Sequence, residues 1–191
     1  MEWNDTDIET DSLSGTPDLS AAEIESDIAD DGFAQWSDTM TQLNPDMDEA
    51  SLQALWEDPC SRTPHQVELA DAVLHPEYET QLSFAIDETG SALRDENGDW
   101  VEMPYGAKGS QRPDGFLEDT EGIHLREQKC YHDLGNLMHN IEAQTDDRRE
   151  AFGEDVDLTY VVAPNFTVEE AERLQRYCEE DLGVSLEWQL K

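Results

Sequence analysis

The residues best suited to chemistry in this chain are two carboxylates and a lysine: Asp114, Glu127 and Lys129. They lie in residues 111–131, a stretch whose pattern indicates two short strands joined by an acidic turn at residues 118–122. If the two strands pair antiparallel, Asp114 and Glu127 approach each other. Two carboxylates beside an ammonium group are suited to a divalent cation that holds a phosphate.

The second predicted strand, residues 123–131, has an unusual order of side chains on one face. Because side chains alternate along a strand, one face carries Ile123, Leu125, Glu127, Lys129 and Tyr131. An acid and an ammonium group therefore stand at the edge of a buried surface. A second interpretation stays open: Glu127 and Lys129 form a same-face ion pair, and Asp114 is a turn residue before Gly115.

The composition is strongly acidic, with a formal net charge of −36. Three explanations compete: a surface adapted to high salt, a disordered acidic tail, or a mimic of nucleic acid that binds a basic partner. The acids are spread over segments with good helical and strand patterns, which favours salt adaptation. An acidic surface opposes nucleic-acid binding at low salt, and the opposition weakens as salt rises.

The chain of 191 residues is long enough for one domain plus an extension. It has no apolar run of membrane-spanning length and no basic start typical of a secretory signal. Its three cysteines are far apart and form no CxxC pair, so neither a zinc site nor a disulfide framework is expected. We therefore predict a cytoplasmic location, or export as an effector without a signal peptide.

The first part of the chain, residues 1–60, is predicted to be an acidic extension that is partly disordered and partly helical. It contains no lysine or arginine. Residues 1–20 have the composition of a disordered segment. A helix is predicted over residues 20–43, with Ser20 as its N-cap, and a second over residues 47–56.

The remainder, residues 61–191, is predicted to be one folded domain. Residues 64–86 are expected to form a helix with a kink at Pro76, which carries Glu68 and Glu79 as candidate site acids. Residues 90–104 are expected to form a hairpin around Asn97-Gly98, a strong turn signal.

A helix is predicted over residues 133–152, and its apolar stripe continues through Gln144 (or Thr145) and Arg148. These two polar residues either bond at the surface or face the site that the preceding strand supplies. The chain then ends with a strand from residue 157, a helix capped by Thr167, and a strand at residues 184–188. That unit implies parallel strands.

This order of elements resembles the restriction-endonuclease-like fold of the PD-(D/E)XK nuclease superfamily. The signature is present as Pro113-Asp114 followed by Glu127-Gln128-Lys129. The outline is most similar to the nuclease domains of bacterial polymorphic toxins, on the basis of Arg112-Pro113-Asp114-Gly115, Tyr131, Gln144 and Arg148. The resemblance covers residues 64–191. The predicted fold is thus α/β: a mixed central sheet flanked by helices in the order α-β-β-β-α-β-α-β.

The resemblance implies a set of roles. Asp114, Glu127 and the backbone carbonyl of Gln128 would hold Mg²⁺, with Mn²⁺ as a substitute, joined by Glu68 or Glu79. Lys129 would orient the attacking water or stabilise the transition-state charge, and Gln144 would position the water or substrate. Contacts to phosphates are expected from three further residues: Lys108, Arg112 and Arg148.

The sequence therefore predicts a metal-dependent nuclease of the toxin or effector type from a salt-adapted organism, with DNA favoured over RNA as substrate. An immunity protein or a delivery partner would accompany such an enzyme. The alternative is a non-catalytic acidic binding protein, either a nucleic-acid mimic or an immunity-type partner of a basic protein. No membrane is expected to take part.

Overall fold

The computed structural model describes residues 21–58, 61–104 and 106–189. The predictions for residues 1–20, disorder and the Ser20 cap, lie outside this range. The elements follow one another as α1 (Ala21–Leu43), α2 (Glu49–Glu57), α3 (Pro64–Leu74), β1 (Phe84–Ala85), β2 (Ser110–Gln111), β3 (Gly115–Glu118), β4 (Ile123–Lys129), α4 (Leu134–Phe152), β5 (Asp157–Val162), α5 (Val168–Arg176), the π-helical turn η2 (Tyr177–Leu182) and β6 (Ser185–Trp188).

The central sheet has four strands in the order β3-β4-β5-β6. β3 pairs antiparallel with β4, whereas β4, β5 and β6 are parallel to one another. The prediction of a mixed sheet flanked by helices is thereby confirmed. β5 and β6 run parallel to β4 because each of them follows a helix that returns the chain to the same end of the sheet.

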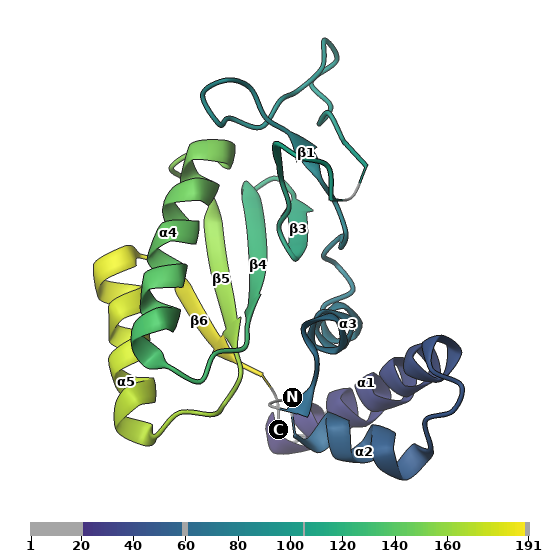
Figure 1. The fold of residues 1–191 in the computed structure, drawn as a ribbon. Helices are drawn as coiled ribbons and strands as arrows, with labels where there is room; N and C mark the ends of the chain where they lie inside the picture. Colours follow the sequence, from purple (N-terminus) through teal and green to yellow (C-terminus); the bar gives the residue numbers. More distant parts are fainter. Residues whose placement is uncertain (1–20, 59–60, 105, 190–191) are drawn as a thin grey trace, which may run out of the picture.

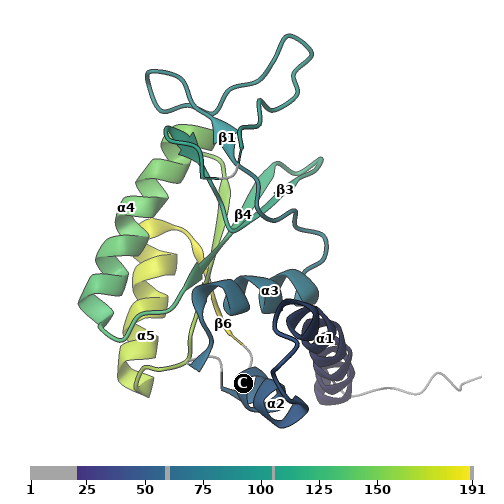
Figure 2. The same ribbon diagram turned by 45° about the vertical axis from the view of Figure 1, so that its right-hand side comes forward.

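The helices lie on both sides of this sheet (Figure 1). α4 and α5 cover one face, while α3 lies near β4 on the other side with α1 and α2 beyond it. The turned view in Figure 2 shows the same arrangement, with α3 between the sheet and the N-terminal helices. Residues carried by α3 and α4 thus reach β4 from opposite sides.

The starts of α3, α4 and α5 and the end of η2 have local causes in the sequence. The Thr63 and Thr167 side chains both form capping boxes, with Gln66 and Glu170 as reciprocal partners. Asp133 accepts a hydrogen bond from the Asn136 N–H and so caps α4, as predicted. Gly183, at φ +64°, follows η2 in the left-handed conformation that glycine adopts readily.

An aromatic cluster fixes the long connection between α3 and β3 to the rest of the domain. The Phe84 ring lies 4.8 Å from that of Phe116 on β3 and 5.4 Å from that of Phe152 on α4, measured between centroids. Trp100 packs edge-on against Phe84, Phe116 and Phe152. These contacts hold β3, and with it the segment that carries Asp114, against the sheet and α4.

A smaller apolar cluster joins α1, α2 and α3. Its buried residues are Trp36, Met40, Leu52, Trp56 and Ala70. The Arg62 guanidinium donates to the carbonyl of Leu55 and lies 5.0 Å from the Trp56 ring centroid. The N-terminal helices are therefore packed on the domain through α3.

Two predicted elements differ from the structure. The helix expected over residues 64–86 ends at Leu74, because Pro76 offers no N–H and disfavours helical backbone at His75. The hairpin predicted at residues 90–104 is reduced to a single bridge, Arg94 to Trp100, and the segment is otherwise bridged to residues 84–86 through Phe84–Glu102 and Ile86–Ala92. The chain from Pro76 to Met103 is therefore mostly irregular.

Candidate active site

The pairing of β3 with β4 places Asp114 beside Glu127. Gly115 lies opposite Arg126, so the next position of the antiparallel register sets Asp114 opposite Glu127. One Asp114 carboxylate oxygen accepts a 2.7 Å hydrogen bond from the Gln128 N–H. A Cβ at Gly115 would lie 3.2 Å from the Arg126 Cβ, so the glycine after Asp114 allows the two strands to approach closely here.

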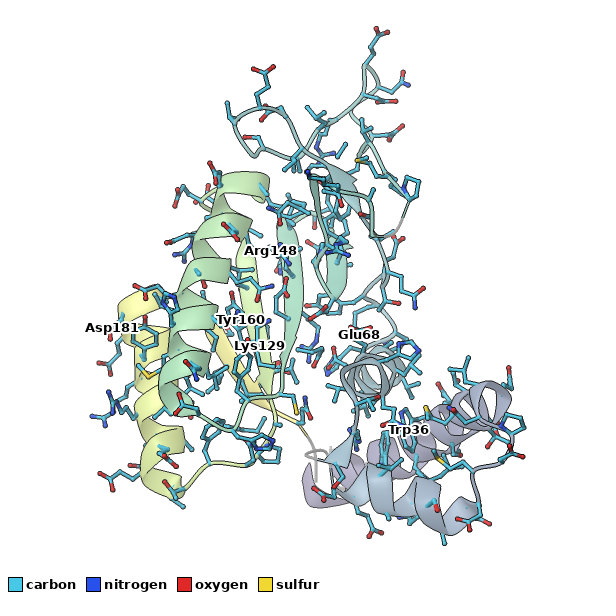
Figure 3. All side chains as sticks on the ribbon, in the orientation of Figure 1. Trp36, Glu68, Lys129, Arg148, Tyr160 and Asp181 are labelled. Carbon is cyan, nitrogen blue, oxygen red and sulfur yellow. The ribbon has the colours of Figure 1, made fainter. Side chains whose placement is uncertain are left out.

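Glu127 is buried and surrounded by donors. Its Oε1 accepts a 2.6 Å bond from Arg148 Nε, and its Oε2 accepts a 2.6 Å bond from Gln144 Nε2. Lys129 Nζ lies 3.7 Å from the same Oε2. Figure 3 shows Lys129 and Arg148 between α4 and the sheet. The polar end of the α4 stripe therefore faces the site rather than solvent, which decides the alternative left open for Gln144 and Arg148.

The protonation equilibria in this cluster are governed by burial. Loss of solvent raises the pKa of Glu127, and the positive charges of Arg148 and Lys129 oppose that rise. Burial lowers the pKa of Lys129, against the opposing effect of Glu127 and Asp114. Lys129 thus gives up its proton more readily than an exposed lysine does.

A pocket of about 440 Å³ opens beside these groups. Asp114, Glu127, Lys129 and Gln144 all line it, and Glu68 reaches it from α3. Burial and the nearby Asp114 charge raise the pKa of Glu68. Carboxylates from β3, β4 and α3 therefore face one opening, with an amine and an amide beside them.

Gln144 presents an unsatisfied oxygen in this pocket. Its Nε2 donates to Glu127, which leaves Oε1 as the other end of the amide. That Oε1 is buried and has no hydrogen-bond partner within the described part of the chain. Buried amide oxygens are normally bonded, so this atom is a candidate ligand for a cation or a donor on a substrate.

The remaining predicted residues have varied positions. Arg112 lines the pocket, whereas Lys108 is exposed and is not among the lining residues. Glu79 bridges to Phe116 through its backbone and does not line the pocket, so Glu68 is the helix acid beside the site. The role of the Gln128 carbonyl stays a prediction.

Arg148 has a different position from the phosphate contact predicted for it. Besides Glu127, its guanidinium donates to the Gln111 Oε1 and, at 3.0 Å, to the Arg112 carbonyl. The side chain is 7% exposed. Arg148 therefore ties α4 to the segment that precedes Asp114 and positions Glu127, instead of reaching into the pocket.

Some features of the site were missed by sequence reasoning. Asn140 and Cys130 also line the pocket. Asn140 precedes Gln144 by one helical turn, a spacing that could have indicated it. Across residues 21–58, 61–104 and 106–189, no three His, Cys, Asp or Glu side chains are grouped so that they could hold a metal ion. Any cation site here must therefore combine the carboxylates with other oxygens.

Comparisons with known proteins add nothing to the geometry: no protein-family model, curated protein or solved structure matches the chain. None of the helices in the described ranges is both long and apolar enough to cross a membrane.

Proposed function

We propose that this chain is a metal-dependent nuclease of the PD-(D/E)XK type that hydrolyses phosphodiester bonds, with DNA as the favoured substrate. The observation that carries the proposal is the shared pocket. Residues from β3, β4, α3 and α4 that lie up to 76 positions apart in the sequence, from Glu68 to Gln144, line one opening. Their types match those that phosphodiester hydrolysis requires.

The donor atoms suit a hard cation. Asp114, Glu127 and the Oε1 of Gln144 supply oxygen donors at the pocket; Glu68 lines it too, but the three carboxylates are not grouped closely enough to share one ion. Oxygen ligands favour Mg²⁺ or Mn²⁺ over zinc. Bound there, such a cation would polarise a phosphodiester and lower the pKa of a water molecule. Glu127 already bonds Arg148 and Gln144, so these two residues would fix its orientation toward the pocket.

Lys129 would handle the proton and charge of the reaction. Its amine is held beside Glu127, and burial makes the neutral form more accessible than in an exposed lysine. In that form it can orient the attacking water and accept a proton, whereas in the charged form it stabilises the developing phosphate charge. Arg112 at the pocket would contact a neighbouring phosphate.

The net charge of −36 determines the conditions under which such an enzyme works. At low salt the acidic surface repels a polyanion, and this repulsion is screened over about 3 Å in 1 M salt. We therefore place the activity in a salt-adapted cell, as a toxin or effector that an immunity protein or delivery partner accompanies.

The test is cleavage of plasmid DNA and of RNA with Mg²⁺, from 0.1 M to molar KCl. The parent is compared with Asp114→Asn, Lys129→Met and, as a matched control, Asp146→Asn at an exposed position of α4. We expect cleavage by the parent and the control, and loss of cleavage in both site variants. Absence of cleavage at every salt, or equal cleavage by all four proteins, would contradict the proposal.

A second function has one observation in its favour. Glu127 and Lys129 already satisfy each other, together with Arg148, as a structural ion cluster would. The chain would then be a non-catalytic acidic protein that mimics nucleic acid or binds a basic partner. Such a protein would displace duplex DNA from a basic DNA-binding protein, and Asp114→Asn would leave that displacement unchanged.

A further inference from the structure

A second cavity, of about 420 Å³, lies on the opposite face of the sheet from α4. It lies between α3 and the strands β4, β5 and β6 and is partly open to solvent. Its walls are mainly apolar, formed by Val67, Ala70, Leu74, Val161 and Trp188. This size and lining are typical of a pocket for a small organic molecule.

Two glutamine side chains bring unsatisfied amide atoms to this cavity. Gln189 is 7% exposed, and both its Oε1 and its Nε2 are buried without a hydrogen-bond partner among the residues described. The Oε1 of Gln128 is in the same condition. Both residues line the cavity. Leaving such groups unpaired is costly, so their presence in one cavity indicates a ligand that pairs with them.

Two arginines line the cavity, and one of them is neutralised by carboxylates. Arg126 donates two 2.9 Å bonds to Asp71 and a 2.7 Å bond to Glu187. Burial opposes the charge of Arg126, but these two carboxylates raise its pKa overall. Arg62 also lines the cavity; its guanidinium donates to the Leu55 carbonyl and lies over the Trp56 ring, and it keeps its positive charge. A ligand therefore meets hydrogen-bonding amides, the neutralised Arg126 and the positively charged Arg62.

We propose that this cavity binds a nucleobase, as a free base, a nucleoside or a base presented by a strand. A glutamine amide offers a donor and an acceptor side by side and pairs with the matching edge of a base. The aliphatic side chains of α3 would lie against the ring. Binding needs neither the cation nor the pocket beside Asp114, so the proposal is independent of the nuclease activity.

The experiment titrates adenosine, guanosine, cytidine and uridine into the metal-free full-length chain. Binding is followed by tryptophan fluorescence and by the rise in melting temperature that a ligand of the folded state causes. We expect saturable binding of at least one nucleoside. Its 5′-monophosphate should bind more weakly at low salt, because the chain is strongly negative. A separate titration with a trinucleotide shows whether a base within a strand also binds.

Variants locate the ligand. Gln189→Met and Gln128→Met keep the side-chain size and remove the amide, and each should weaken binding roughly tenfold or more. Gln35→Met, at an exposed position of α1, should bind like the parent. Circular dichroism checks that each variant is folded. If Gln189→Met does not fold, nucleoside binding by Gln128→Met tests the proposal. Absence of binding by the parent at millimolar nucleoside, or equal binding by both cavity variants, would overturn the proposal.

Discussion

The Arg148→Met substitution tests the network that holds Glu127. It removes the 2.6 Å bond to Glu127 and leaves the Gln111 Oε1 and the Arg112 carbonyl without this donor. Breaking a buried ion pair by removing one partner typically costs about 3–5 kcal/mol. We expect a loss of that size in the free energy of unfolding, measured by urea titration with circular dichroism.

The pH dependence of the same variant gives an independent reading. Burial raises the pKa of Glu127 in the folded state, and loss of Arg148 removes the positive charge that opposes this rise most strongly. A carboxyl group with a raised folded-state pKa binds protons more tightly in the folded protein than in the unfolded chain. The free energy of unfolding should therefore rise as the pH falls toward the unfolded pKa of glutamate, by about 1.4 kcal/mol for each unit of difference in pKa.

Two further proteins serve as controls. Arg173→Met, at an exposed position of α5, should change stability by less than about 0.5 kcal/mol. The double variant Glu127→Gln/Arg148→Met should recover part of the loss, because it no longer buries an uncompensated charge. The reasoning is refuted if Arg148→Met is as stable as Arg173→Met, or if its stability does not depend on pH more than that of the parent.

Three other predictions follow from separate features. Lys129→Met should change the free energy of unfolding by less than about 1 kcal/mol in the same urea assay, because the loss of an ion pair is offset by removal of a buried ammonium group. DNA cleavage by this variant should fall at least about 100-fold. A loss of stability that parallels the loss of cleavage would assign Lys129 a structural role. Raising KCl from 0.1 M to 1 M should increase the melting temperature, because it shortens the Debye length from about 10 Å to 3 Å and so screens the net charge of −36. A melting temperature that does not change with KCl would argue against self-repulsion. Gly183→Ala should lower the free energy of unfolding by about 1 kcal/mol, because the φ of Gly183 is +64°. Gly135→Ala, in the helical backbone of α4, should be neutral or stabilising. Equal urea midpoints for the two variants would contradict this prediction.

Much of the fold could be predicted because local signals and tertiary packing agree. The caps at Asp133 and Thr167, the apolar stripe of α4 and the buried strand β5 each specify one element in a few residues. The region from residue 75 to residue 103 could not be predicted in this way. Its shape depends on the packing of Phe84 and Trp100 against Phe116 and Phe152, and these partners lie far away in the sequence.

Part of the candidate site could also be predicted from the sequence, and part could not. Strand alternation was sufficient to place Glu127 and Lys129 on one face and to bring Asp114 opposite Glu127. The bonds of Arg148 to Glu127 and to the Arg112 carbonyl could not be read from spacing, because they depend on how α4 lies against β4. The choice between Glu68 and Glu79 likewise required the true end of α3.

The position of α3 links the two halves of the molecule. This helix contributes Ala70 to the apolar cluster of α1 and α2, and Asp71 to the salt bridge with Arg126 on β4. It also carries Glu68 to one pocket and Leu74 to the other. A protein that binds α1 and α2 and displaces them would also move α3. It would then change the openings of both pockets without contacting either pocket.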